Sequence, residues 1–148
     1  MPFIPATNVV RLSDLVVHEL DPAVGYSRRD INITAATEAT LGMVVAREIT
    51  SDLEAPYAPV TDAAQLVDTN EFAVVFGDEF SFNPSFTARA IVAGQYNAVG
   101  FVGTSGALQL KEYYIKKYIV DDAELTEANY ETLKGLLEAQ GIQILKTV

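Results

Sequence analysis

The residues that could carry out chemistry are few and scattered along the chain. His18 is the single histidine, and it stands beside Glu19 in a segment interrupted by prolines. A histidine general base needs a nucleophile and an orienting partner around it, and no serine lies in a GxSxG context. The chain has no cysteine, which excludes thiol nucleophiles, CxxC redox motifs and cysteine-ligated zinc. The sequence therefore predicts no catalytic residue, no cofactor and no enzyme.

Two short segments contain fragments of nucleotide-related motifs. Residues 77–80 read Gly-Asp-Glu-Phe, as in the diguanylate cyclase signature, but Phe76 stands where that signature requires a glycine. Residues 100–106 space three glycines as in a phosphate loop, yet they lack its GK[ST] lysine. A turn explains each of the two segments better than a nucleotide site does. A small enzyme or nucleotide-binding domain therefore ranks third among the functions that the sequence suggests.

Carboxylates dominate the charge of the chain. The net charge is −10, from 20 acidic and 10 basic residues. Nucleic-acid-binding proteins carry basic surfaces, so we expect no nucleic-acid partner. No Lys or Arg interrupts residues 48–88, where a solvated acidic face and a surface that steers a basic partner are both possible. The carboxylates of this stretch are Glu48, Asp52, Glu54, Asp62, Asp68, Glu71, Asp78 and Glu79.

A second acidic cluster, Asp121, Asp122 and Glu124, offers oxygens of the kind that Ca²⁺ prefers. It lacks the glycine-centred loop of an EF-hand, and the same residues suit a turn before a helix. We expect no metal site there. The longest uncharged run, residues 90–110, contains four glycines and several polar residues, so it does not read as a bilayer span. The first ten residues lack the features of a signal peptide, and no membrane partner is expected.

The pattern of apolar residues predicts a small, mostly β domain of the α+β class. Strands are expected near residues 31–34, 43–46, 72–76, 88–92 and 142–145. Thr126 as an N-cap and Gly141 after the last turn predict one C-terminal helix between them. Residues 108–119 fit a helix or a strand, and the helix is preferred. Residues 50–70 contain two prolines and few large apolar side chains, which predicts a long surface excursion.

Residues 1–26 differ from the rest and are predicted to be an extended N-terminal arm outside the packed core. Pro2, Pro5 and Pro22 interrupt this segment. Such an arm either stays disordered or orders against a partner by adding a strand. Residues 27–148 are then a single domain. The apolar side chains that would contact the partner are Phe3, Ile4, Val9, Val10, Leu15, Val16 and Val17.

Four segments in order resemble the head decoration proteins of tailed bacteriophages, the lambda D-like capsid cement family. Residues 26–34 with 40–46 are similar to the opening of that family, and Ser27, Arg28, Arg29 and Gly42 carry this similarity. Residues 72–78 look like its next strand, residues 90–97 like its strand and turn, and residues 133–142 like its terminal helix and strand. Residues 100–125 look like an insertion relative to the compact members.

The resemblance implies a β-barrel or β-tulip-like fold and a structural role in the virion. The expected protein is a homotrimer that binds the major capsid protein at three-fold positions outside an icosahedral head and stabilises the expanded capsid. It would be made in the host cytoplasm and located on the outer capsid surface. The alternative is a receptor- or glycan-binding module of the virion surface, suggested by Tyr96, Tyr113, Tyr114 and Tyr118.

Overall fold

The computed structural model describes residues 15–18, 28–34, 39–52, 54–77, 85–86, 89–92, 95–102 and 108–146. These residues form a mixed, mostly β domain of the α+β class, as predicted. The elements in chain order are β1 (Val16–His18), β2 (Arg28–Thr34), β3 (Ala39–Thr40), β4 (Val44–Glu48), β5 (Ala58–Pro59), the 3-10 helix η2 (Ala63–Gln65), β6 (Asn70–Gly77), β7 (Ser85–Phe86), β8 (Arg89–Val92), β9 (Gln95–Phe101), β10 (Leu108–Lys111), α1 (Glu112–Lys117), the π-helical η3 (Tyr118–Asp122), α2 (Glu127–Ala139) and β11 (Ile142–Leu145).

Six strands form one curled sheet, which we call the half-barrel sheet. Its order is β2-β9-β6-β4-β5, and β8 also pairs with β9. All these pairs are antiparallel. The sheet curls until its two edges meet, because Thr34 N–H donates to Tyr57 O and Tyr57 N–H donates to Asn32 O, both at 2.7 Å. In β2 the alternation is plain: Ile31 and Ile33 are buried, whereas Asp30 is exposed.

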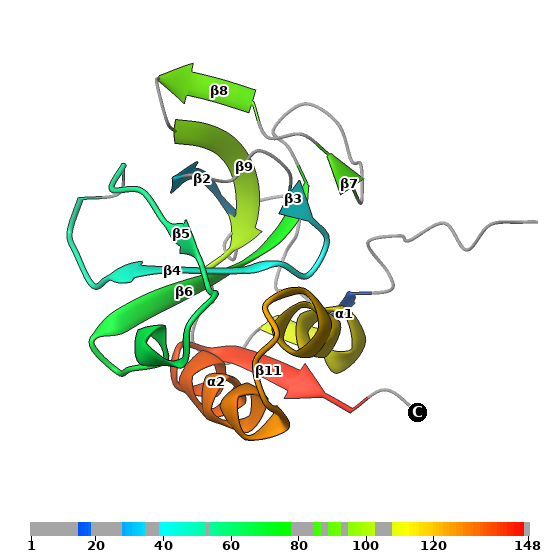
Figure 1. The fold of residues 1–148 in the computed structure, drawn as a ribbon. Coiled ribbons are helices and arrows are strands. Elements are labelled where there is room, and N and C mark those ends of the chain that lie inside the picture. The colour runs from blue at the N-terminus through cyan, green and yellow to red at the C-terminus, as the bar shows by residue number, and fades with distance from the viewer. Residues whose placement is uncertain are drawn as a thin grey trace, which may run out of the picture.

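Three strands form a second sheet, which we call the terminal sheet because it takes strands from both ends of the described chain. β10 lies in its centre, antiparallel to β1 and parallel to β11. Parallel neighbours need a crossover connection, and α1, η3 and α2 supply it. Figure 1 shows these helices and β11 on one side of β4 and β6, with β2, β8 and β9 on the other. The short β3 pairs with β7.

The helix α2 lies where Thr126 and Gly141 favoured one. The Thr126 side chain accepts from Asn129 N–H, which closes a capping box, and Gly141 takes a φ of 94°. It is not the only helix, however. Residues 108–119 divide between a strand and a helix, because β10 passes directly into α1 at Glu112.

The predicted surface excursion at 50–70 and the expected insertion at 100–125 both contribute to the core. The excursion at 50–70 has little regular structure, but its residues Tyr57, Val60 and Leu66 are buried. The expected insertion at 100–125 contains side chains that are 0% exposed, so this segment builds the interior rather than decorating it. Those side chains are Phe101, Leu108, Leu110, Ile115 and Ile119.

The arm prediction is corrected for residues 15–18. Leu15 is fully buried in the core, Val16 packs against the core, and β1 is a strand of the terminal sheet. The prolines that favoured an arm lie outside these four residues, and a three-residue strand has no periodicity to reveal it. Residues 15–18 therefore belong to the packed domain rather than to an arm outside it.

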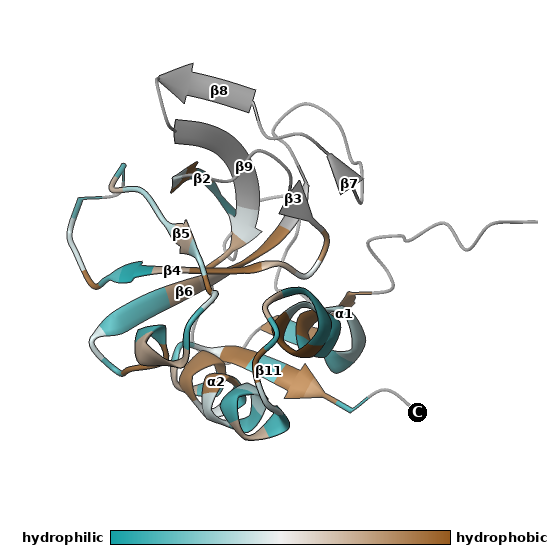
Figure 2. Ribbon diagram, viewed as in Figure 1, coloured by the Kyte–Doolittle hydropathy of each residue, from teal (hydrophilic) through white to brown (hydrophobic). Residues whose placement is uncertain are grey.

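The hydropathy of the strands follows the layers. Figure 2 shows hydrophobic colours on β11 and on the parts of β4 and β6 near it, and hydrophilic colours where β4 ends and β6 begins. That hydrophilic end carries Glu48 and Asn70, which pair across the two strands. One end of the half-barrel sheet is thus available to solvent.

Candidate interaction surface

The N-terminal segment enters the domain at a fixed point. Lys111 N–H donates to Leu15 O at 2.6 Å, and Val16 lies opposite Leu110 in the sheet. Two residues after the buried Leu15, Val17 is 46% exposed. Of the predicted arm contacts, Val16 and Val17 lie in β1, and Leu15 directly precedes it. Phe3, Ile4, Val9 and Val10 lie outside the described residues.

The motif that follows the predicted arm has a structural part in the half-barrel sheet. Arg28 and Arg29 begin β2, and the Arg28 guanidinium lies 5.7 Å from the centre of the Phe101 ring. Both arginines are partly buried. Ser27 lies outside the described residues. These contacts place the two arginines where β2 pairs with the end of β9.

Gly42 joins the two layers. Its φ is +90°, a conformation that side chains rarely adopt, and Gly42 N–H donates to Val75 O at 2.9 Å. A Cβ at this position would lie 2.6 Å from Tyr114 Cβ and 2.8 Å from the Tyr114 carbonyl carbon. Only a glycine lets the turn before β4 approach α1 this closely. The sequence singled out Gly42 by resemblance, and its contacts explain the residue physically.

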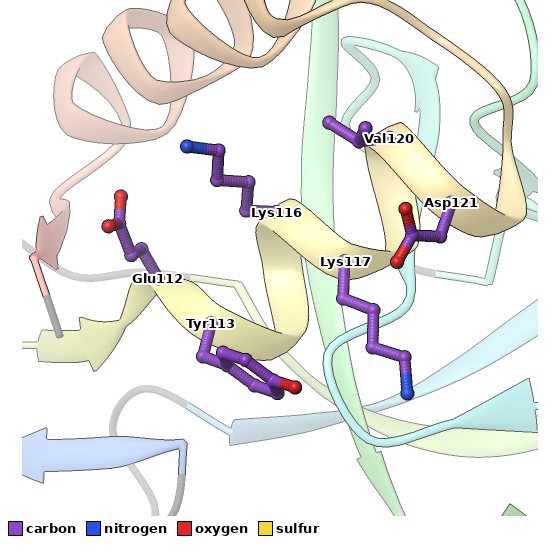
Figure 3. A pocket seen from close by; sticks show the side chains of 6 residues that line it. All are labelled: Glu112, Tyr113, Lys116, Lys117, Val120 and Asp121. Atoms are coloured by element: carbon purple, nitrogen blue, oxygen red, sulfur yellow. The ribbon is translucent and has the colours of Figure 1, made fainter.

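A shallow groove of about 340 Å³ runs along α1 and η3. One ridge consists of Glu112, Lys116 and Val120, and the other of Tyr113, Lys117 and Asp121. Figure 3 shows Glu112 and Lys116 projecting to one side of the helix, and Tyr113 and Lys117 to the other. Both ridges have the spacing of four residues that places side chains on one helix face.

Several side chains of this groove are held in place by tyrosines. Tyr130 OH donates to Glu112 Oε2 at 2.9 Å, and Lys116 Nζ lies 5.6 Å from the centre of the Tyr130 ring. Tyr113 meets the Tyr114 ring edge-on, with 4.9 Å between the centroids. Tyr113 is also 56% exposed. The groove thus presents an oriented aromatic ring beside charges of both signs.

The four tyrosines behind the glycan-binding alternative have different environments. Tyr113 is exposed, whereas Tyr114 packs against Gly42 and Tyr118 is buried. Tyr118 OH donates to Val60 O at 3.0 Å, and burial raises its pKa to about 12. The side chain of Tyr96 lies outside the described part. The three described tyrosines therefore do not form one exposed aromatic platform.

Buried tyrosines recur across the domain. Burial, followed by the hydrogen bond with Glu112, raises the pKa of Tyr130. Burial also raises the pKa of Tyr57, and the nearby Arg47 partly offsets this effect. A raised pKa keeps a phenol neutral, so all three hydroxyls are protonated near neutral pH.

The acidic stretch forms an exposed end of the half-barrel sheet. Two large apolar residues, Ile49 at 63% and Val67 at 40%, are exposed in the same region, where Ile49 N–H donates to Thr69 O at 3.1 Å. The exposed carboxylates there are Glu48, Asp52, Glu54, Asp62 and Asp68. Asp78 and Glu79 lie outside the described residues. The exposure of these five carboxylates agrees both with a solvated acidic face and with a surface that steers a basic partner.

Arg47 holds this end together from within. Among the described residues it is the buried charged side chain, and it pairs with the Glu71 carboxylate. It also donates from Nη1 to Ala55 O at 2.6 Å and lies 4.3 Å from the centre of the Tyr57 ring. A buried guanidinium needs such partners to offset the loss of hydration. Arg47 therefore fixes the loop around Ala55 to the start of β6.

The remaining candidate motifs acquire few contacts that would support chemistry. Gly100 belongs to β9, where a Cβ would lie 2.8 Å from Ile31 Cδ1, so its role is close packing. Gly77 ends β6, and residues 78–80 and 103–106 lie outside the described part. Within the described ranges, no group of three or more His, Asp or Glu residues is placed to hold a metal ion. No helix in those ranges is long and apolar enough to cross a membrane.

Comparison with known proteins adds no relative. No protein-family model, no curated protein and no solved structure matches the chain. Within the described residues, the exposed sites that a partner could contact include Val17 at the N-terminal entry, the groove around Tyr113, and the acidic end around Ile49.

Proposed function

We propose that the chain is a structural virion protein that binds the outside of an icosahedral phage head at three-fold positions and stabilises the expanded capsid. The partner is the major capsid protein, and the active form is a homotrimer on the outer capsid surface. The fold expected with this role is the β-tulip-like fold of the lambda D-like decoration proteins.

One observation carries the proposal more than any other. The segments that resemble the decoration family come together in space as well as in order. Residues 26–34, 40–46, 72–78 and 90–97 include strands of a single curled sheet, namely β2, β4, β6, β8 and the start of β9. The last segment, 133–142, runs through α2 into β11. Four weak similarities whose residues belong to one folded domain support a common origin with the decoration family better than four similarities in unconnected segments would.

The charge and the N-terminal entry agree with this role. A protein with a net charge of −10 gains nothing from packaged DNA, and its exposed carboxylates suit a position outside the shell. Binding to the assembled capsid but not to dissociated subunits stabilises the assembly by mass action. Three arms on one trimer would raise the effective concentration of each, so a modest contact per arm could give tight capture.

The test is deletion of residues 1–14, followed by co-sedimentation with expanded capsids. The deletion stops before Leu15, because removing that side chain would open the core. We expect a folded protein whose capsid affinity falls at least about 10-fold, since burying even one large apolar side chain contributes that much. Decoration equal to that of the full chain would exclude the arm mechanism.

A matched control keeps the length of the arm. Replacing Phe3, Ile4, Val9 and Val10 with serine removes the apolar contacts without shortening the chain, and it should weaken binding as the deletion does. Light scattering on the free protein should give about three times the chain mass of 16.1 kDa if the trimer forms before binding.

A further inference from the structure

The three residues of β1 and the preceding Leu15 are held by contacts of different kinds. Leu15 is 0% exposed, its carbonyl accepts from Lys111 N–H at 2.6 Å, and Val16 pairs with Leu110. Leu110 is itself fully buried in the central strand of the terminal sheet. Releasing β1 would therefore expose Leu15 and uncover one edge of β10.

The strength of these contacts indicates that β1 stays paired with β10 when a partner binds the chain before it. Burial of a leucine side chain alone favours the closed state about 10- to 100-fold. The antiparallel pairing adds hydrogen bonds to that preference. Against this, β1 is only three residues long, and its register with β10 is irregular between Val16 and His18.

We infer that Leu15–His18 is a fixed attachment point, which we call the root, for the N-terminal segment. The buried Leu15 side chain, which we call the plug, holds the root in the terminal sheet. A load that a partner places on the residues before Leu15 then passes into β10 rather than peeling β1 away. The inference rests on the proposed function only for the identity of that partner, an exposed strand edge of the major capsid protein.

The absence of cysteine allows a direct test with single-cysteine variants of the full chain. Leu15→Cys is compared with Val17→Cys, which should be freely accessible, and with Ile115→Cys, a fully buried position of α1. The rate of reaction with a thiol reagent is measured in the free protein. We expect Val17→Cys to react at least about 100-fold faster than Leu15→Cys, because a buried thiol reacts only when the structure opens.

The comparison with Ile115→Cys decides the inference. A fixed root predicts that Leu15→Cys and Ile115→Cys react equally slowly, because both then need the same opening of the core. Faster reaction of Leu15→Cys would mean that β1 detaches by itself, and the inference would be wrong. If Leu15→Cys fails to fold, hydrogen exchange of the unaltered chain replaces it. The informative amide is that of Lys111, which donates to Leu15 O. Exchange of this amide as slow as that of the other paired β10 amides supports the root, and fast exchange overturns it.

A failure of this inference is distinguishable from a failure of the proposed function. The labelling rates need no capsid, so they report on the root alone. Deletion of residues 1–14 reports on capsid binding alone. If Leu15→Cys reacts slowly and the deletion variant still binds capsids normally, the root is supported and the capsid arm is excluded. If Leu15→Cys reacts quickly and the deletion variant loses capsid binding, the arm is supported and the root is excluded.

Discussion

The half-barrel sheet and the terminal sheet are built in different ways from the same chain. The half-barrel sheet uses strands from one continuous stretch, from β2 to β9. The terminal sheet combines β1, near the start, with β10 and β11, near the end. In the first, β4 pairs with β5 and with β6, and β8 pairs with β9, which are near in sequence, although β2 pairs with the distant β9. In the second, β1 meets β10 from the opposite end of the described chain. The difference shows that the integrity of the domain depends on the contacts that hold the two sheets together.

Three described contacts join the half-barrel sheet and its loops to the helices α1, η3 and α2 of the other layer. We call this set of contacts the seam. Gly42 lets the turn before β4 approach Tyr114 of α1. Gln140, at the end of α2, accepts from Phe72 N–H at 2.8 Å and donates to Val102 O at 2.8 Å and to Phe72 O. Tyr118 of η3 donates to Val60 O after β5. Each contact can be removed separately, and the expected losses differ in size.

Gly42→Val should have the largest effect. The new side chain would meet the Tyr114 backbone and Cβ in a strained conformation, and together these cost about 3 kcal/mol or more of unfolding free energy. Urea unfolding measures the loss. The control is Gly135→Ala in α2, where no atom lies within 4 Å of the new Cβ. That control should stabilise the domain by about 1 kcal/mol through helix propensity. A tolerated Gly42→Val would mean that the seam adjusts easily.

Gln140→Ala should come next, with a loss of about 2 kcal/mol. The amide of Gln140 satisfies backbone groups of β6 and of the residue after β9, and alanine leaves them without that partner. The matched control is Gln143→Ala, which removes only an exposed hydrogen bond with Gln109 of 2.9 Å. It should change stability by less than about 0.5 kcal/mol. Equal losses in thermal melts would show that Gln140 does not connect the layers.

Tyr118→Phe should have a smaller effect, about 1 kcal/mol, because it removes one buried hydrogen bond and keeps the ring. The control Tyr113→Phe changes an exposed hydroxyl and should be neutral within about 0.5 kcal/mol. Denaturant midpoints at pH 7 distinguish the two. A neutral Tyr118→Phe would indicate that ring packing, not the hydroxyl, joins η3 to the chain after β5.

The smallest expected effect is that of Tyr118 ionisation on the stability of the fold, which is absent at neutral pH and develops in alkaline solution. The pKa of Tyr118 rises from 10.0 to about 12, chiefly through burial. Between those values the unfolded chain releases the proton while the folded one keeps it, so stability should fall as pH rises through this window. Tyr118→Phe should lose stability less steeply than the parent chain between pH 9 and 11. Parallel curves would contradict a buried, neutral Tyr118.

The sequence predicted the half-barrel sheet better than the terminal sheet, for a physical reason. Alternation in β2 and apolar runs at β4 and β6 reflect burial within a local sheet, so they are visible in a short window. The caps of α2 are local as well. In contrast, β1 and β10 are strands because they pair with each other, and β10 also pairs with β11. β10 enters α1 through Lys111 without a side-chain cap.

The interaction surface was predictable only in part. Gly42 was found by resemblance, although a glycine before a buried strand gives no sign of Tyr114 beside it. Leu15, Val16 and Val17 were recognised as an apolar cluster, but their division into buried plug and exposed edge depends on β10. Tyr113 differs from Tyr118 by burial alone, and their similar surroundings in the sequence conceal this.

The position of β1 has a consequence for how the protein forms during synthesis. The ribosome releases Leu15 early, but its partners Leu110 and Lys111 emerge much later, and β11 only at the end. The half-barrel sheet can therefore be complete while the N-terminal segment still lacks its own sheet. Pairing between such distant segments is slow and leaves an apolar strand exposed meanwhile. Newly made chains should therefore complete the terminal sheet only after β11 has left the ribosome, so this sheet should form after the half-barrel sheet.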